Sequence, residues 1–425
     1  MGHFFKYGVY FMFEKDYSWF DFSRFGMFIH WGVYSMGARY TWLKSHERMT
    51  NEEYDRYVKH FDPDLFDPRE WARLARRAGM RYVVFTAKHH DGFCMFDSKV
   101  TDYKYKEKDL LKGVIDAFRA EGLRIGVYYS LPDWHHPNYP RDARHPQRSE
   151  PQEVDFLPYR AYLHDQVREI LTNYGKIDMI WFDGSYLETM HIWDMPRLAE
   201  MARTLQPGIL ISRLPGHDDF DTPEQNIPQQ GLFDEKGNPK HWEGCQVLHG
   251  EWCYIRDKKW KTVPELIQML IRHVSRGGNL LLNVGPTSRG ALDDHTVSLL
   301  NGLGDWMKWH SRAFHGCCGA PAEFPEPEFC RYTWNPEKRC LYLHLFSWPD
   351  RRIDLPNLAG KVEYAQLLND GSEIQFTETL PVDETLDAPA RVNNAKAPAP
   401  GNIRLALPVE SPENCPVPVI ELFLK

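Results

Sequence analysis

Short apolar segments alternate with longer amphipathic segments from about residue 68 to residue 310. In the first pair, Trp71, Leu74, Ala75 and Ala78 recur at helical spacing, and the apolar run 81–87 follows them as a strand. The same alternation predicts helices over residues 108–122, 157–175, 194–208, 262–278 and 296–310, and strands over residues 123–130, 176–184, 209–213 and 279–286. This order is typical of βα units around a parallel sheet.

The number of these units indicates the fold class. With residues 25–35 as the first strand, six or seven strand and helix pairs precede residue 310. That number favours a closed (β/α)8-type barrel over an open, doubly wound α/β sheet. No glycine-rich phosphate motif follows any strand, which argues against a dinucleotide-binding domain. We therefore predict a (β/α)8-like catalytic domain over residues 1–317.

The pattern changes after roughly residue 318. Short alternating runs, divided by proline and glycine, occupy residues 330–349, 361–368, 372–380 and 402–408. Such runs are typical of antiparallel strands joined by turns. We predict a small C-terminal antiparallel β-sandwich domain over residues 318–425, with residues 387–402 as a loop inside it.

Composition and charge exclude several partners. Of 425 residues, 42% are hydrophobic, and the net charge of −8 supplies no basic field for nucleic acid or an anionic membrane. No apolar stretch approaches the roughly 20 residues that cross a bilayer. The first 20 residues show neither a basic start nor a small-residue cleavage site, and the eight cysteines lack CxxC spacing. We expect a cytoplasmic protein, unless a leader has been trimmed.

The carboxyl ends of the predicted strands carry side chains that suit a sugar. In a barrel of this type the active site lies at that end. Imidazoles, indoles, an arginine and a carboxylate can bind hydroxyl groups and pack against the C–H face of a sugar. These positions are His30, Trp31, Lys88, His89, His90, Asp91, Tyr128, Tyr129, Trp134, His135, His136, Trp181, Asp183, Arg213 and Asn283. Each could instead cap a helix or satisfy a loop, Asp183 included, since Gly184 turns the chain there.

The sequence His89-His90-Asp91 also raises the question of a metal. Neighbouring side chains on a strand point to opposite faces, so the two imidazoles converge only if the strand has ended at Ala87. A metal site needs three or four converging ligands, and neither HxH nor HExxH spacing is present. We therefore expect no metal and no other cofactor, and interpret the histidines as hydrogen-bonding groups for a ligand.

Six segments in order carry a resemblance to a known family. They are FGMFIHWG at 25–32, TAKHHDGFCMFDS at 86–98, GVYYSLPDWHHPNY at 126–139, IWFDG at 180–184, DFDTPEQNIP at 219–228 and RGGNLLLNVGPTSRG at 276–290. Between about residues 18 and 310 the chain resembles glycoside hydrolase family 29, the retaining α-L-fucosidases. The resemblance implies a barrel with a C-terminal β-sandwich, no metal, and exo-cleavage of terminal α-L-fucose through a covalent glycosyl-enzyme. The expected partner is a fucosylated oligosaccharide or glycoconjugate.

The resemblance also implies roles for individual residues. The nucleophile of the family falls on Asp183, and its sugar-binding side chains fall on His30, Trp42, His89, His90, Tyr128, Trp181 and Arg213. The acid/base is expected at Glu243, with Glu251 and Glu224 as rivals. Burial near Trp242 and Cys245 would raise the pKa of Glu243, as a proton donor requires, while Arg213 and the histidines would keep Asp183 charged.

One position departs from the family pattern. Many relatives have an acidic residue beside the aromatic that contacts the sugar, whereas Thr41 precedes Trp42 here. Another loop or a neighbouring subunit could supply the missing contact, so a homo-oligomer is possible. The change also leaves open a glycosidase acting on a related galacto-configured or 6-deoxy sugar. An inactive carbohydrate-binding homologue and a metal-dependent hydrolase are the remaining alternatives.

Overall fold

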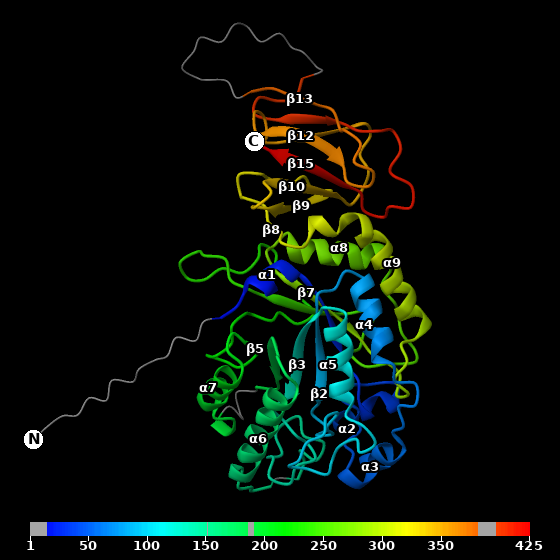
Figure 1. Ribbon diagram of the computed structural model, residues 1–425, viewed down its shortest axis with the longest axis vertical. Helices are drawn as coiled ribbons and strands as arrows, with labels where there is room; N and C mark the ends of the chain where they lie inside the picture. Colours follow the sequence, from blue (N-terminus) through cyan, green and yellow to red (C-terminus); the bar gives the residue numbers. More distant parts are fainter. Residues whose placement is uncertain (1–14, 151, 186–190, 381–396) are drawn as a thin grey trace, which may run out of the picture.

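The computed structural model describes residues 15–150, 152–185, 191–380 and 397–425. A parallel α/β body forms one part of the chain, and the C-terminal strands stack on one end of it, beside α8 (Val263–Val274) (Figure 1). The predicted loop over 387–402 lies mostly outside the described residues.

The α/β body contains seven parallel strands in the order β5-β4-β3-β2-β1-β7-β6. Their bounds are β1 Phe25–Ile29, β2 Tyr82–Lys88, β3 Arg124–Ser130, β4 Met179–Asp183, β5 Leu210–Ser212, β6 Glu243–Val247 and β7 Asn279–Val284. The strands are buried on both faces, as expected for a parallel sheet covered by helices. The predicted barrel type is therefore confirmed, with seven regular strands.

Amphipathic helices connect these strands and bury one face against them. Their bounds are α1 Ser18–Ser23, η1 Val33–Gly37, α2 Leu43–His46, α3 Asn51–His60, α4 Pro68–Arg77, α5 Leu110–Ala120, α6 Leu157–Asn173, α7 Met195–Leu205, α8 Val263–Val274, α9 Asp294–His310 and η3 Ser311–Ala313. In α4, Asp67 caps the first turn and Trp71 and Ala75 are buried, as the helical spacing predicted. No helix in the described part of the chain is long and apolar enough to span a membrane.

An irregular segment lies between the two edge strands, β5 and β6. Isolated parallel bridges join Ser212 to Phe220, Asp221 to Trp242 and Glu224 to Cys245. Residues 220–224 therefore occupy the place of an eighth strand without forming a regular ladder. Neither this segment nor β6 was predicted, because residues 214–261 show no clear hydrophobic period.

The C-terminal strands form two antiparallel sheets. One has the order β12-β15-β10-β9-β8 and the other β11-β14-β13. Their bounds are β8 Cys318–Gly319, β9 Cys330–Asn335, β10 Cys340–Leu345, β11 Arg352–Leu355, β12 Val362–Leu367, β13 Phe376–Glu378, β14 Ile403–Ala406 and β15 Val419–Leu424. Leu341, Leu343, Ile353 and Leu405 are among the residues of the core between them. The predicted sandwich is present, and its first strand begins at Cys318.

Candidate active site

A cavity of about 230 Å³ lies at the carboxyl ends of the strands. It is lined by Phe28, His30, Trp42, His89, Tyr128, Arg144, Trp181, Asp183, Arg213, Glu224, Cys245 and Trp252. Seven of the nine predicted site residues are in this set, and an eighth, His90, has its Nε2 3.5 Å from Oδ2 of Asp183. The strand ends thus bring together residues up to 183 positions apart, because parallel strands share one rim. Phe28, Arg144, Cys245 and Trp252 were not predicted.

Asp183 is the most constrained carboxylate of the cavity. It ends β4 and accepts hydrogen bonds from the Tyr128 hydroxyl and the Gly184 backbone N–H, both at 2.8 Å. A nitrogen of Arg213 lies 3.4 Å away and Nε2 of His90 3.5 Å away. Burial alone would raise the pKa of Asp183, but the positive charge of Arg213 and the two hydrogen-bond donors outweigh burial and lower it. The carboxylate is therefore ionised at neutral pH.

Asp183 does not cap α7, because Asp194 occupies the N-cap position of that helix. The turn after Asp183 instead needs a glycine, because Gly184 has a φ of 80° and a Cβ there would meet Cδ of Pro132 at 2.3 Å. The tight approach of two loops thus fixes where the strand ends and where the carboxylate points.

The paired histidines follow the end of β2 at Lys88, one residue later than the prediction required for convergence. The rings of His89 and His90 lie 4.3 Å apart between centroids, and both side chains are buried. Burial lowers the pKa of His90 to about 4 and that of His89 well below its usual value. Within the described ranges, no group of three or more His, Cys, Asp or Glu side chains could hold a metal ion.

His30 lies beside the same cluster, with its ring centroid 5.8 Å from that of His89. It follows β1, and its Nδ1 lies 2.7 Å from Oδ1 of Asn283, which belongs to β7. Burial lowers the pKa of His30 to about 4, so this ring is also neutral near pH 7. The part of the cavity wall beside His30 and His89 therefore consists of neutral imidazoles and aromatic rings, a surface that suits hydroxyl groups more than charged ones.

Arg213 stands between two carboxylates. Besides its contact with Asp183, one guanidinium nitrogen lies 2.9 Å from Oε2 of Glu224, and its guanidinium carbon lies 4.9 Å from the ring centroid of Trp181. Asp183 and Glu224 raise the pKa of Arg213, so that the arginine stays charged. Both acids therefore reach the same cationic group at the cavity.

Glu224 lies at the end of the irregular segment 220–224, at the level of Cys245 in β6. Its side chain is 46% exposed and lines the cavity. The motif DTPEQ contains this residue. The sequence around it has no strand pattern that would predict how far Glu224 lies along the barrel axis.

Glu243 lies deeper in the barrel than the acid/base position predicted for it. It begins β6, two residues nearer the amino end than Cys245, and a strand advances about 3.3 Å per residue. The side chain is fully buried and is not among those lining the cavity. Its carboxyl accepts hydrogen bonds from Tyr82 at 2.5 Å and from the indole nitrogen of Trp181 at 3.2 Å. In this position Glu243 lies below the cavity, and its predicted acid/base role has no support from the cavity lining.

The buried position of Glu243 nevertheless produces the expected electrostatic effect. Burial raises the pKa of Glu243 to about 7, and the two hydrogen bonds oppose this rise only in part. A raised pKa is expected of a carboxyl group that donates a proton to the substrate. The raised pKa of Glu243 instead results from its burial beneath Trp181.

Glu251 lies beside Thr41, the position that departs from the family pattern. The Thr41 hydroxyl donates to Oε1 of Glu251 at 2.7 Å and accepts from the backbone N–H of Cys253 at 3.0 Å. Oε1 of Glu251 also accepts from the backbone N–H of Trp252 at 2.9 Å. A carboxylate from the loop after β6 thus lies beside Thr41 and holds the loop that brings Trp252 to the cavity.

Comparison with known proteins agrees with this arrangement. The sequence profile of the alpha-L-fucosidase family matches residues 13–312. The tissue alpha-L-fucosidase of Mus musculus is 28% identical over 371 residues, which cover 79% of either chain. An alpha-L-fucosidase of Dictyostelium discoideum is 28% identical over 444 residues, covering 95% of this chain and 91% of the relative.

Solved structures of similar proteins share the whole fold. The alpha-L-fucosidase isoenzyme 1 from Paenibacillus thiaminolyticus superposes with a TM-score of 0.89 at 39% identity, covering 96% of this chain and 98% of the other. A Bacteroides thetaiotaomicron alpha-L-fucosidase of family GH29, trapped as a covalent intermediate with 2-fluoro-fucosyl fluoride, has a TM-score of 0.81 at 26% identity, covering 96% and 95%.

Proposed function

Because the chain belongs to the alpha-L-fucosidase family, glycoside hydrolase family 29, and is a retaining α-L-fucosidase, we propose that Asp183 is its nucleophile and Glu224 its acid/base. The observation that carries the assignment is Arg213, which contacts both carboxylates at the cavity. The cavity lining favours Glu224 over Glu243 and Glu251 for the acid/base role, because Glu224 is the one of these three that lines it.

The two carboxylates divide the reaction between them. In the first step, a carboxylate oxygen of Asp183 bonds to the anomeric carbon, the glycosidic C–O bond breaks, and Glu224 gives its proton to the leaving oxygen. In the second step, water attacks the anomeric carbon, the bond to Asp183 breaks, and Glu224 takes a proton from the water. The developing positive charge on the sugar lies next to the ionised Asp183, which stabilises it.

Arg213 holds Glu224 at the cavity, since a guanidinium nitrogen lies 2.9 Å from Oε2 of Glu224 while another lies 3.4 Å from Oδ1 of Asp183. Retaining enzymes use two carboxyl groups about 5–5.5 Å apart. Two carboxylates that contact one guanidinium are close neighbours, as this mechanism requires.

The size of the cavity supports exo-cleavage. Its volume of about 230 Å³ is below the roughly 300–1,000 Å³ of pockets for drug-sized ligands, so it accommodates a single sugar ring. Trp181, Trp252 and Phe28 supply flat apolar walls for the C–H face of that ring. The rest of a fucosylated glycan would lie outside the cavity.

Azide rescue distinguishes the two roles. With an aryl α-L-fucoside that has a good leaving group, Asp183→Ala should lose at least about 10⁴-fold in kcat, and azide should restore turnover by forming the β-fucosyl azide. Glu224→Ala should hydrolyse this substrate slowly but lose about 10²–10⁴-fold on a poor leaving group, and azide should give the α-fucosyl azide.

Glu243→Gln serves as the matched control, since it replaces another carboxyl of the same barrel without changing its shape. It should yield no fucosyl azide. Formation of the α-azide by Glu243→Gln, and not by Glu224→Ala, would overturn the assignment of Glu224. Release of the β anomer of fucose by the wild-type enzyme, observed by NMR, would rule out retention.

A cytoplasmic location is a further part of this proposal. All eight cysteines are free thiols, and six of them are buried. Unpaired buried thiols are typical of a reducing compartment. Cell fractionation with an antibody against the native chain would test the location, and recovery outside the cytoplasm would contradict it.

A further inference from the structure

The hydrogen-bond partners of His90 determine which ring nitrogen carries its proton. The Ser130 hydroxyl donates its single hydrogen to the Pro132 carbonyl at 2.6 Å, because a carbonyl can only accept. The same hydroxyl oxygen lies 2.6 Å from Nδ1 of His90 and can therefore only accept there. Nδ1 of His90 carries the hydrogen, and in the neutral ring Nε2 carries a lone pair.

Nε2 of His90 faces a second acceptor. It is buried, has no hydrogen-bond partner among the described residues, and lies 3.5 Å from Oδ2 of the ionised Asp183. A buried lone pair beside a carboxylate is unfavourable unless a donor hydrogen-bonds to it. The group that enters here during the reaction is a sugar, and its hydroxyls are donors.

His30, whose ring also neighbours that of His89, has the same arrangement. The amide nitrogen of Asn283 donates to the Trp252 carbonyl at 2.5 Å, so its amide oxygen is the atom 2.7 Å from Nδ1 of His30. An amide oxygen only accepts, so Nδ1 of His30 carries the hydrogen. Both histidines therefore have their Nε2 atoms free to accept.

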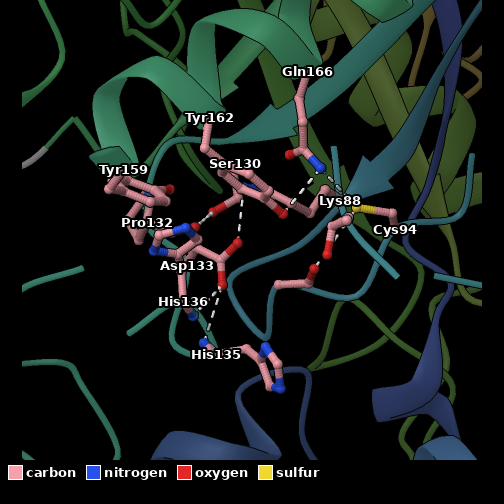
Figure 2. A network of polar contacts seen from close by, with 12 residues as sticks. Lys88, Cys94, Ser130, Pro132, Asp133, His135, His136, Tyr159, Tyr162 and Gln166 are labelled. Atoms are coloured by element: carbon pink, nitrogen blue, oxygen red, sulfur yellow. Dashed lines mark hydrogen bonds and ion pairs between the residues drawn. The ribbon is translucent and has the colours of Figure 1, made fainter. Parts of the chain in front are cut away.

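The loop whose Pro132 carbonyl accepts the hydrogen bond from Ser130 is held by a buried ion pair (Figure 2). Nζ of Lys88 lies 3.2 Å from Oδ2 of Asp133, and neither side chain is exposed by more than 2%. The ammonium group also lies 4.4 Å from the ring centroid of Tyr129, and the Tyr159 hydroxyl donates to the Leu131 carbonyl. These contacts surround Pro132, so its carbonyl has little freedom to turn away from Ser130.

We propose that Ser130 and Asn283 are positioning residues that hold His90 and His30 as Nδ1–H tautomers, so that both rings accept hydrogen bonds from the hydroxyl groups of the sugar. This inference rests on the proposed function, because it takes Asp183 as the nucleophile. Since Nε2 of His90 lies beside Asp183, the hydroxyl it accepts from is the one next to the reacting carbon, the 2-hydroxyl.

Removal of the Ser130 hydroxyl should reverse the tautomer of His90. In Ser130→Ala, Nδ1 loses its acceptor, and the ring gains by moving its hydrogen to Nε2, where Asp183 accepts it. The histidine then cannot accept from the substrate. We expect kcat/KM for an aryl α-L-fucoside to fall about 10- to 100-fold. For the 2-deoxy analogue, which has no hydroxyl to donate, it should fall less than about threefold.

Two variants separate positioning from general damage. Ser212→Ala removes another buried hydroxyl, at the end of β5, which β4 separates from the strand of Ser130. Ser212 bonds Thr222 at 2.9 Å, and the variant should change kcat/KM for both substrates less than about threefold. Ser130→Thr keeps the hydroxyl and should recover most of the activity. An equal loss on the full and the 2-deoxy substrate in Ser130→Ala would overturn the proposal. Coupling to the 3- or 4-deoxy analogue instead would overturn the assignment of the 2-hydroxyl.

NMR of 15N-histidine-labelled protein provides a readout that needs no turnover. Ring nitrogen shifts should report Nδ1–H for His90 in the wild type and Nε2–H in Ser130→Ala, with the assignment made from a His90→Gln sample. An Nε2–H signal in the wild type would refute the tautomer. If this signal is Nδ1–H while the wild type fails to hydrolyse any α-L-fucoside, the proposed function fails and the tautomer assignment stands.

Discussion

The buried ion pair behind the histidines offers a quantitative test of the structure. Lys88 and Asp133 have exposed side-chain fractions of 0% and 2%. Asp133 also accepts the backbone N–H groups of His135 and His136, each at 3.0 Å. Asp133→Asn removes the charge but keeps an amide oxygen for these N–H groups, so it isolates the loss of the ion pair.

The expected free-energy changes follow from burial. Removing one partner of a buried pair costs about 3–5 kcal/mol, because the other charge remains unpaired in the interior. We expect about 3 kcal/mol for Asp133→Asn, in which the amide oxygen still faces Lys88. Asp133→Ala should cost about 5 kcal/mol, since two backbone N–H groups also lose their acceptor. The double variant Lys88→Met, Asp133→Asn should cost less than about 1.5 kcal/mol, because no charge is left to desolvate.

Urea unfolding followed by tryptophan fluorescence measures these differences as a double-mutant cycle. The loss in Asp133→Asn should not change between about 0.1 and 0.5 M salt, since salt screens exposed pairs and not buried ones. Our reasoning is refuted if Asp133→Asn costs less than about 1 kcal/mol, or if the double variant is as unstable as the single one.

Three further predictions concern the cavity and the carboxyl beneath it. Burial raises the pKa of Glu243 to about 7, well above that of an unfolded glutamate. The wild type should therefore lose up to about 3 kcal/mol of stability relative to Glu243→Gln as the pH rises from about 4.5 to 7. Urea unfolding that shows the same pH dependence in both proteins would contradict this. Gly184→Ala should abolish most activity and lower the unfolding temperature, because the new Cβ meets Pro132; normal kcat/KM in this variant would be unexpected. Arg213→Met should move the acidic limb of the kcat/KM profile to higher pH, because Arg213 lowers the pKa of Asp183; an unchanged limb would show that other groups hold the charge.

The sequence by itself determined the fold class and most of the cavity wall. Alternating strand and helix patterns require parallel strands, and parallel strands bring their carboxyl ends to one rim. The strand and helix pattern predicts that residues at the strand ends lie close together. Five such residues line the cavity: His30, His89, Tyr128, Asp183 and Arg213.

The depth of each carboxyl group was decided only by the tertiary structure. Glu243 and Glu224 both lie in the stretch without a clear period, and which of them reaches the cavity depends on the register of β6 and of segment 220–224. Register is set by pairing with neighbouring strands, and a shift of two residues moves a side chain by about 6.6 Å along the barrel axis. Burial raises the pKa of a carboxyl at the bottom of the barrel as well as in a catalytic pocket, so the composition around Glu243 could not reveal its place. The tautomers of His30 and His90 likewise depend on Asn283 and Ser130, partners that only the folded chain brings within hydrogen-bonding distance.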